Sequence, residues 1–141
     1  MPSRYFAIDA SAGLIKRATG LAAVTATAYV GTQWDQKAAV ITEGICVIQL
    51  SAIDVASADE VYTFRVVGSN VADRSDGQVL GQIQTGIVVS PGTVVGAAGD
   101  QLTIRFLTER NDTSFRYVDL HLTAAGTTPS ITFSAFFSKE F

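Results

Sequence analysis

Apolar and polar residues alternate along several stretches of the chain. Within residues 116–123, the apolar side chains Val118, Leu120 and Leu122 share one face, and the residues between them lie on the other. Successive side chains of a β-strand point to opposite faces of the sheet, so a period of two is typical of a half-buried strand. The same alternation recurs in residues 61–67, 101–108 and 130–137. Four half-buried strands are therefore predicted at these positions.

Four weaker stretches add to this set. Residues 45–52 are apolar on both faces over their first half, as in a central strand, and residues 79–84 are short and fit an edge strand. Their β-branched content marks residues 25–30 and 87–90 as further strands. Clusters of Gly, Pro, Asp and Ser separate the stretches, and no helical period is sustained for three turns. About eight strands spaced by turns predict an all-β, single-domain, jelly-roll-like antiparallel β-sandwich.

The first twenty residues lack a clear pattern. We expect residues 1–20 to form an N-terminal arm or an irregular first strand, and residues 21–141 to form the sandwich. A chain of 141 residues fits one domain. It can bury roughly two-thirds of its unfolded surface, so it needs no metal or disulfide in order to fold.

Composition narrows the class of partner. Apolar residues make up 48% of the chain and charged residues 16%, below the roughly 25% of an average soluble domain. Such a sparsely charged surface suits a protein whose exterior is partly covered by partners. The formal charge is −3 and no basic stripe is present, so we expect no nucleic-acid partner. The start lacks the layout of a secretory signal and no apolar run approaches ~18 residues, so we expect a soluble protein made in a cytoplasm, with no membrane partner.

The sequence offers few groups for catalysis or metal binding. Cys46 is the single cysteine, which excludes an internal disulfide and favours a buried thiol. His121 is the single histidine, and Asp119 shares its strand face; the two could be a base with its orienting carboxylate, or two polar residues on an outer face. The second interpretation is favoured because no Gly-x-Ser-x-Gly nucleophile motif completes a site. Residues 73–77 faintly suggest a calcium loop but lack EF-hand spacing. We therefore expect no enzyme, no metal and no cofactor.

Two aromatic residues stand out as candidate surface groups. Trp34 lies in a polar context, where it could stack on a sugar, anchor an interface or plug one end of the sandwich. Phe136 must face outward if its neighbour Phe137 faces the core. A carbohydrate-binding β-sandwich, with Trp34 and Tyr117 as its platform, is therefore the alternative function.

The order of several pieces is distinctive. Residues 24–30 read Val-Thr-Ala-Thr-Ala-Tyr-Val, an opening strand rich in Thr and small residues. Residues 64–70 form a strand that ends in Gly-Ser before a polar loop. Residues 116–123, a Gly-Thr-Thr-Pro turn and residues 130–136 close the series.

Over residues 21–137 this layout resembles the jelly-roll cement, or decoration, proteins on the heads of tailed bacteriophages. The resemblance implies a structural virion protein on the capsid surface, assembled in the host cytoplasm. It also implies binding to the major capsid protein and to copies of itself, as a homodimer or homotrimer, and it offers no catalytic residues. The candidate capsid contacts are basic and aromatic residues of the first twenty together with two aromatic residues of the sandwich: Arg4, Tyr5, Phe6, Lys16, Arg17, Trp34 and Phe136.

Overall fold

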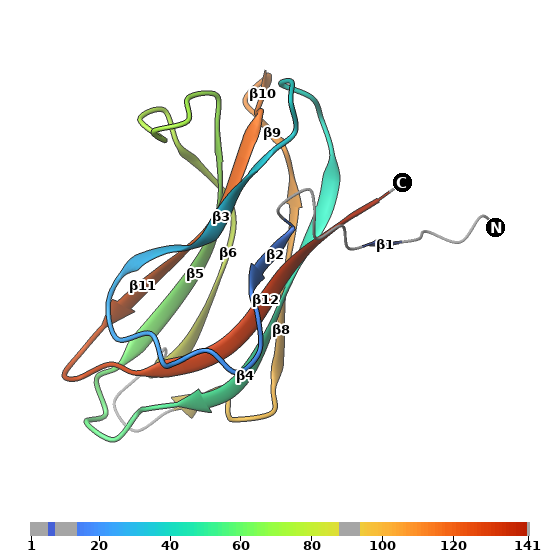
Figure 1. Cartoon of the computed structure of the whole chain (residues 1–141). Helices are drawn as coiled ribbons and strands as arrows, with labels where there is room; N and C mark the ends of the chain where they lie inside the picture. The colour runs from blue at the N-terminus through green and yellow to red at the C-terminus, as the bar shows by residue number, and fades with distance from the viewer. Residues whose placement is uncertain (1–5, 8–13, 88–93, 141) are drawn as a thin grey trace.

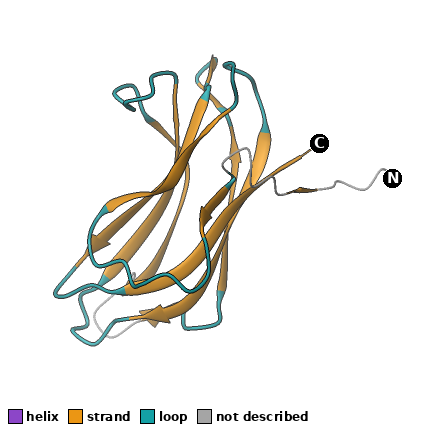
Figure 2. Ribbon diagram, in the orientation of Figure 1, coloured by secondary structure: helices purple, strands orange, loops and turns teal. Residues whose placement is uncertain are grey.

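The computed structural model describes residues 6–7, 14–87 and 94–140. These residues form strands and loops and no helix (Figure 2). The strands are β1 (Phe6–Ala7), β2 (Ile15–Arg17), β3 (Ala28–Asp35), β4 (Glu43–Ile53), β5 (Val61–Ser69), β6 (Gln78–Ile87), β7 (Val94–Val95), β8 (Gln101–Leu107), β9 (Glu109–Arg110), β10 (Thr113–Ser114), β11 (Tyr117–Ala125) and β12 (Ile131–Glu140).

The longer strands form two antiparallel sheets that face each other (Figure 1). In the first, here called sheet A, the order is β1-β12-β4-β8, and β2 also pairs with β12. In the second, sheet B, the order is β3-β11-β5-β6-β7. The short β9–β10 hairpin lies at one end of the sandwich, together with the loops that follow β3 and β5 (Figure 1).

The pairing of strands defines a jelly roll. Among the eight strands of the sandwich, β2 pairs with β12, β3 with β11, β4 with β8, and β5 with β6. The first strand thus meets the last, the second meets the next to last, and so on inward, as in one long hairpin rolled into two sheets. The fold class predicted from the sequence is confirmed.

The core consists of the alternate apolar side chains that the period-two pattern picked out. Inward-facing residues of β5, β11 and β12 are buried, among them Phe64 and Phe133, which belong to opposite sheets. Their rings meet edge to face with centroids 5.0 Å apart, a favoured geometry for aromatic pairs. The buried side chains of both sheets join in a single cluster that also contains Trp34 and Cys46.

Three boundaries differ from the sequence prediction. The strand expected at residues 25–30 is β3, which begins at Ala28 and continues to Asp35. The two strands expected at residues 79–84 and 87–90 are one strand up to Ile87, and residues 88–90 lie outside the described part. Gly86 lies between the two predicted strands and lowers strand propensity. Its φ is 97° and a Cβ there would lie 2.5 Å from the Glu60 carbonyl oxygen, so the strand requires glycine at this position.

Candidate functional site

β2 closes one edge of the sandwich. It pairs with β12 and also approaches β3, where a Cβ on Gly31 would lie 2.1 Å from the carbonyl oxygen of Lys16. Gly31 has a φ of 72°, so both its conformation and this contact require glycine. Leu14, directly before β2, is fully buried, and its carbonyl oxygen accepts a hydrogen bond from the Phe137 N–H at 2.7 Å. The first strand is therefore part of the body of the domain.

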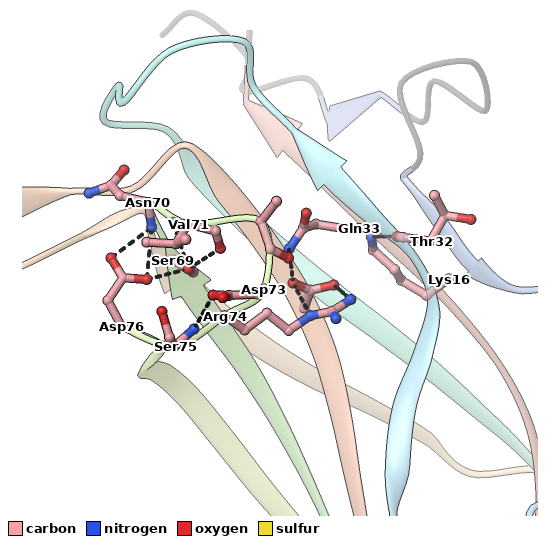
Figure 3. Close-up of polar contacts among 12 residues, drawn as sticks. Lys16, Thr32, Gln33, Ser69, Asn70, Val71, Asp73, Arg74, Ser75 and Asp76 are labelled. Carbon is pink, nitrogen blue, oxygen red and sulfur yellow. Dashed lines mark hydrogen bonds and ion pairs between the residues drawn. The ribbon is translucent and has the colours of Figure 1, made fainter.

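The two basic residues of β2 turn toward the interior. Lys16 is 3% exposed, its Nζ lies 4.5 Å from the ring centroid of Phe137, and it donates a hydrogen bond to the Thr32 carbonyl at 2.6 Å (Figure 3). The guanidinium of Arg17 lies 5.1 Å from the ring centroid of Phe133, and its Nε donates to the Phe133 carbonyl at 3.0 Å. Each cation thus rests on an inward-facing phenylalanine of β12. Lys16 has no exposed surface to offer a capsid, and we remove it from the candidate contacts.

Trp34 is an interior residue. It is 3% exposed, and its ring meets Phe137 at 6.3 Å between centroids. Of the three interpretations left open by the sequence, the structure matches a ring packed inside the sandwich. A sugar-binding platform of Trp34 and Tyr117 does not form, because Trp34 is buried and the guanidinium of Arg116 lies 4.9 Å from the Tyr117 ring.

Of the other candidate capsid contacts, some lie on the surface and some lie outside the described residues. Phe136 faces outward as predicted, because it pairs with Val47 and Ile15 on the outer face of sheet A. Arg4 and Tyr5 lie outside the described residues. Phe6 lies in β1, where it pairs with Glu140 at the end of β12.

A shallow concavity opens on the outer face of sheet A. Its volume is about 240 Å³, and its lining includes Ile15, Ala135 and Phe136 with the polar residues Gln49 and Ser134. Ile15 is 44% exposed although it is a large aliphatic residue. We call this surface the sheet A concavity.

The outer face of sheet B is built differently, around a buried carboxylate. Asp119 is 1% exposed and accepts hydrogen bonds from Arg74 Nε at 2.9 Å, Arg74 Nη2 at 3.0 Å and Gln33 Nε2 at 2.8 Å. Figure 3 shows Arg74 and Gln33 converging from two different segments of the chain. The guanidinium of Arg74 also lies 4.1 Å from the ring centroid of Tyr29. A bidentate arginine is the arrangement that best compensates a carboxylate removed from water.

The loop after β5 folds over this face because it satisfies its own backbone. Asp76 accepts hydrogen bonds from the Ser69 hydroxyl and, at 3.0 Å, from the Asn70 N–H. Asp73 accepts from the Ser75 N–H at 2.9 Å (Figure 3). Short polar side chains commonly fix turns in this way. The carboxylates of the suggested calcium loop are therefore engaged within the loop, and the described residues contain no group of three or more potential metal ligands.

Asp119 does not orient His121. Its carboxylate is held by Arg74 and Gln33, whereas the His121 ring packs edge-on against Tyr29 with centroids 4.8 Å apart. Burial, and secondarily the charge of Arg65, lower the pKa of His121. The two residues therefore match the interpretation as polar groups on an outer strand face.

Sequence reasoning missed an exposed apolar loop between β3 and β4. Residues 38–41 read Ala-Ala-Val-Ile, all four are exposed, and Ile41 reaches 61% exposure. The signal was present as an uncharged run beside a predicted strand, but aliphatic residues in such a run are usually assigned to the core. Burial of Cys46 was predicted correctly, and this burial raises the pKa of its thiol to about 12. Across the part of the chain that is described, no helix has the length and apolar character to span a membrane.

Comparisons with known proteins identify no family for this chain. No protein-family model matches the chain, and no curated protein matches it. Among solved structures, it is similar to the Clostridium thermocellum N-terminal endo-1,4-beta-D-xylanase 10B, in a complex of its CBM22-1 and GH10 modules with xylohexaose. The TM-score is 0.41 and the identity 12%, over 95% of this chain and 24% of that chain. A likeness of this size supports no conclusion about function.

Replacing Lys16 with Met tests whether the ammonium group is buried. Burial lowers the pKa of Lys16 from 10.5 to about 8, and the nearby Asp119 charge opposes this effect only in part. Between about pH 8 and 10.5 the unfolded chain holds a proton that the folded chain lacks, so the free energy of unfolding rises with pH. Relative to Lys16→Met, the wild type should gain about 3 kcal/mol over this range, at about 1.4 kcal/mol per pH unit. Urea unfolding of both proteins at a series of pH values measures this gain. If the free energies of unfolding of the two proteins changed with pH in parallel, the predicted burial of the ammonium group would be contradicted.

Replacing Arg74 with Ala tests the buried carboxylate. The change leaves Asp119 charged, buried and short of two hydrogen bonds, which should lower the free energy of unfolding by about 3 kcal/mol. Lys37→Ala is the matched control, since its Nζ is 3.7 Å from Asp35 but its side chain is 84% exposed. The control should change the free energy of unfolding by less than about 1 kcal/mol. Urea unfolding at pH 7 compares the two, and equal losses would show that Asp119 is solvated.

Proposed function

We propose that this chain is a structural virion protein, a capsid cement or decoration protein that binds the outer surface of a phage head and bridges major capsid protein subunits. Two lines of support come from the sequence: the resemblance described above, and the low content of charged residues. The structure adds a closed jelly roll with exposed large aliphatic side chains, including Ile15 and Ile41. Such a domain can resist deformation while it presents apolar surface to neighbours.

The observation that carries the proposal is the position of the N-terminal strand at the edge of sheet A. β1 pairs with the last residues of β12, Phe6 opposite Glu140 and Ala7 opposite Lys139. β1 is thus an edge strand of sheet A, beside the C-terminal end of β12 (Figure 1). The predicted contacts Arg4 and Tyr5 directly precede this edge strand in the sequence. An extended segment in that position can add main-chain hydrogen bonds to a partner.

The physical role follows from the geometry of a shell. Packed DNA presses outward on a capsid, and the seams between capsid subunits bear that load. A small subunit that contacts two neighbours adds contact area at each seam, and symmetry repeats the contribution over the particle. A modest affinity per copy therefore suffices.

Deleting residues 1–13 tests the attachment. The deletion keeps Leu14 and β2, so the domain should stay folded while binding to phage heads is lost. Deleting the whole expected arm, residues 1–20, would also remove the buried Leu14 and Lys16 and destabilise the sandwich. Heads that lack the protein are mixed with the full chain or with the truncated chain and imaged, and circular dichroism confirms folding. Density on the outer surface with the full chain only is the expected result. Equal density with both chains would refute the role of the segment, and none with either would refute the proposed function.

A further inference from the structure

The loop between β3 and β4 is fixed by hydrogen bonds in a conformation that exposes its aliphatic side chains to water. Val40 is 43% exposed and Ile41 61%, next to Leu107 of β8 at 42%. Exposed aliphatic residues usually lie singly, whereas these follow two exposed alanines in an uncharged run. We call residues 38–41 the apolar tip.

One buried hydroxyl group forms hydrogen bonds with the backbone on both sides of Ile41. Thr108 is fully buried, and its Oγ1 donates to the Val40 carbonyl at 2.7 Å and accepts from the Thr42 N–H at 2.7 Å. The Thr42 hydroxyl in turn donates to Gln36 Oε1 at 2.6 Å, and Gln36 Nε2 donates to the Phe115 carbonyl at 2.8 Å. Ile41 therefore sits between two residues that are fixed to the body of the domain. Because the tip is already ordered, little conformational entropy remains to be lost when it binds.

The sheet A concavity has the complementary shape and chemistry. Its volume of about 240 Å³ exceeds the roughly 150 Å³ that holds a benzene-sized group in a protein cavity, so a branched aliphatic side chain fits. Ile15 and Phe136 supply apolar surface, and the one charged residue of its lining, Arg17, is engaged with the carbonyl oxygens of Phe133 and Ala22. The concavity is therefore a largely apolar recess, whose one charged group is already hydrogen-bonded within the chain, and the same chain carries an apolar projection.

We propose that the apolar tip of one copy, led by Ile41, inserts into the sheet A concavity of a second copy. The tip and the concavity come from different elements, so the contact joins two different patches. Such contacts close into a reciprocal dimer or a ring, or they extend into an open filament. Neither patch carries a cluster of basic residues, which favours a second copy over a nucleic acid or an anionic membrane, since both would require a basic surface. This contact does not depend on attachment to a capsid, and it uses no residue of β1.

A mixing experiment tests the contact. Sedimentation velocity over a range of concentrations should show the wild type associating, and Ile41→Asp and Phe136→Ser should each weaken association at least about tenfold. An equimolar mixture of the two variants should regain a dimer, because the first variant keeps an intact concavity and the second keeps an intact tip. Raising the salt concentration should not weaken association, since neither patch contributes an ion pair.

Controls separate this contact from general effects. Val71→Asp makes the same change at a residue that is 43% exposed and outside both patches, and it should associate like the wild type. Ile15→Ser provides a second variant of the concavity if Phe136→Ser unfolds, as circular dichroism would reveal. A wild type that stays monomeric at every concentration overturns the proposal. So does a mixture that fails to associate when both variants are folded, or an association that salt abolishes.

Discussion

The pairing of β2 with β12 decides which side chains lie inside the sandwich and which lie on its surface. It places Lys16 and Arg17 over the inward-facing rings of Phe137 and Phe133, and it places Ile15 beside Phe136 on the outside. The same pairing buries Leu14. This one strand of three residues closes the edge of the sandwich and forms part of the sheet A concavity. It also decides how many N-terminal residues can be deleted without loss of the fold.

The two outer faces of the sandwich differ in polarity. On sheet B, the loop after β5 covers Asp119 with Arg74, and a second bidentate pair, Arg116 with Asp35, lies nearby in the same sheet. The guanidinium of Arg116 holds the pKa of Asp35 well below its usual range. On sheet A, the lining of the open recess is apolar or uncharged except for Arg17. This asymmetry is the reason why the proposed contact between copies uses sheet A, because apolar surface gains most when water is removed from it.

The period of two predicted most of the fold, because strands with one buried face must alternate. Val118, Leu120 and Leu122 lie inside as expected. The pattern could not predict the orientation of Lys16 and Arg17, because a register irregularity opposite them turns two consecutive side chains inward. Nor could it pair Arg74 with Asp119, which are 45 residues apart. Ile41 was missed because an exposed isoleucine and a buried one look alike in a sequence.

Amide hydrogen exchange at Phe137 tests the account most directly. The N–H of Phe137 donates to the carbonyl oxygen of Leu14, so its protection reports whether the first strand is closed against β12. Protection equal to that of the central amides of β11 is expected, because the bond would then open only when the whole domain unfolds. Exchange at the rate of an open loop would show that β2 is detached, and the buried cations, the recess and the contacts inferred from them would be lost with it.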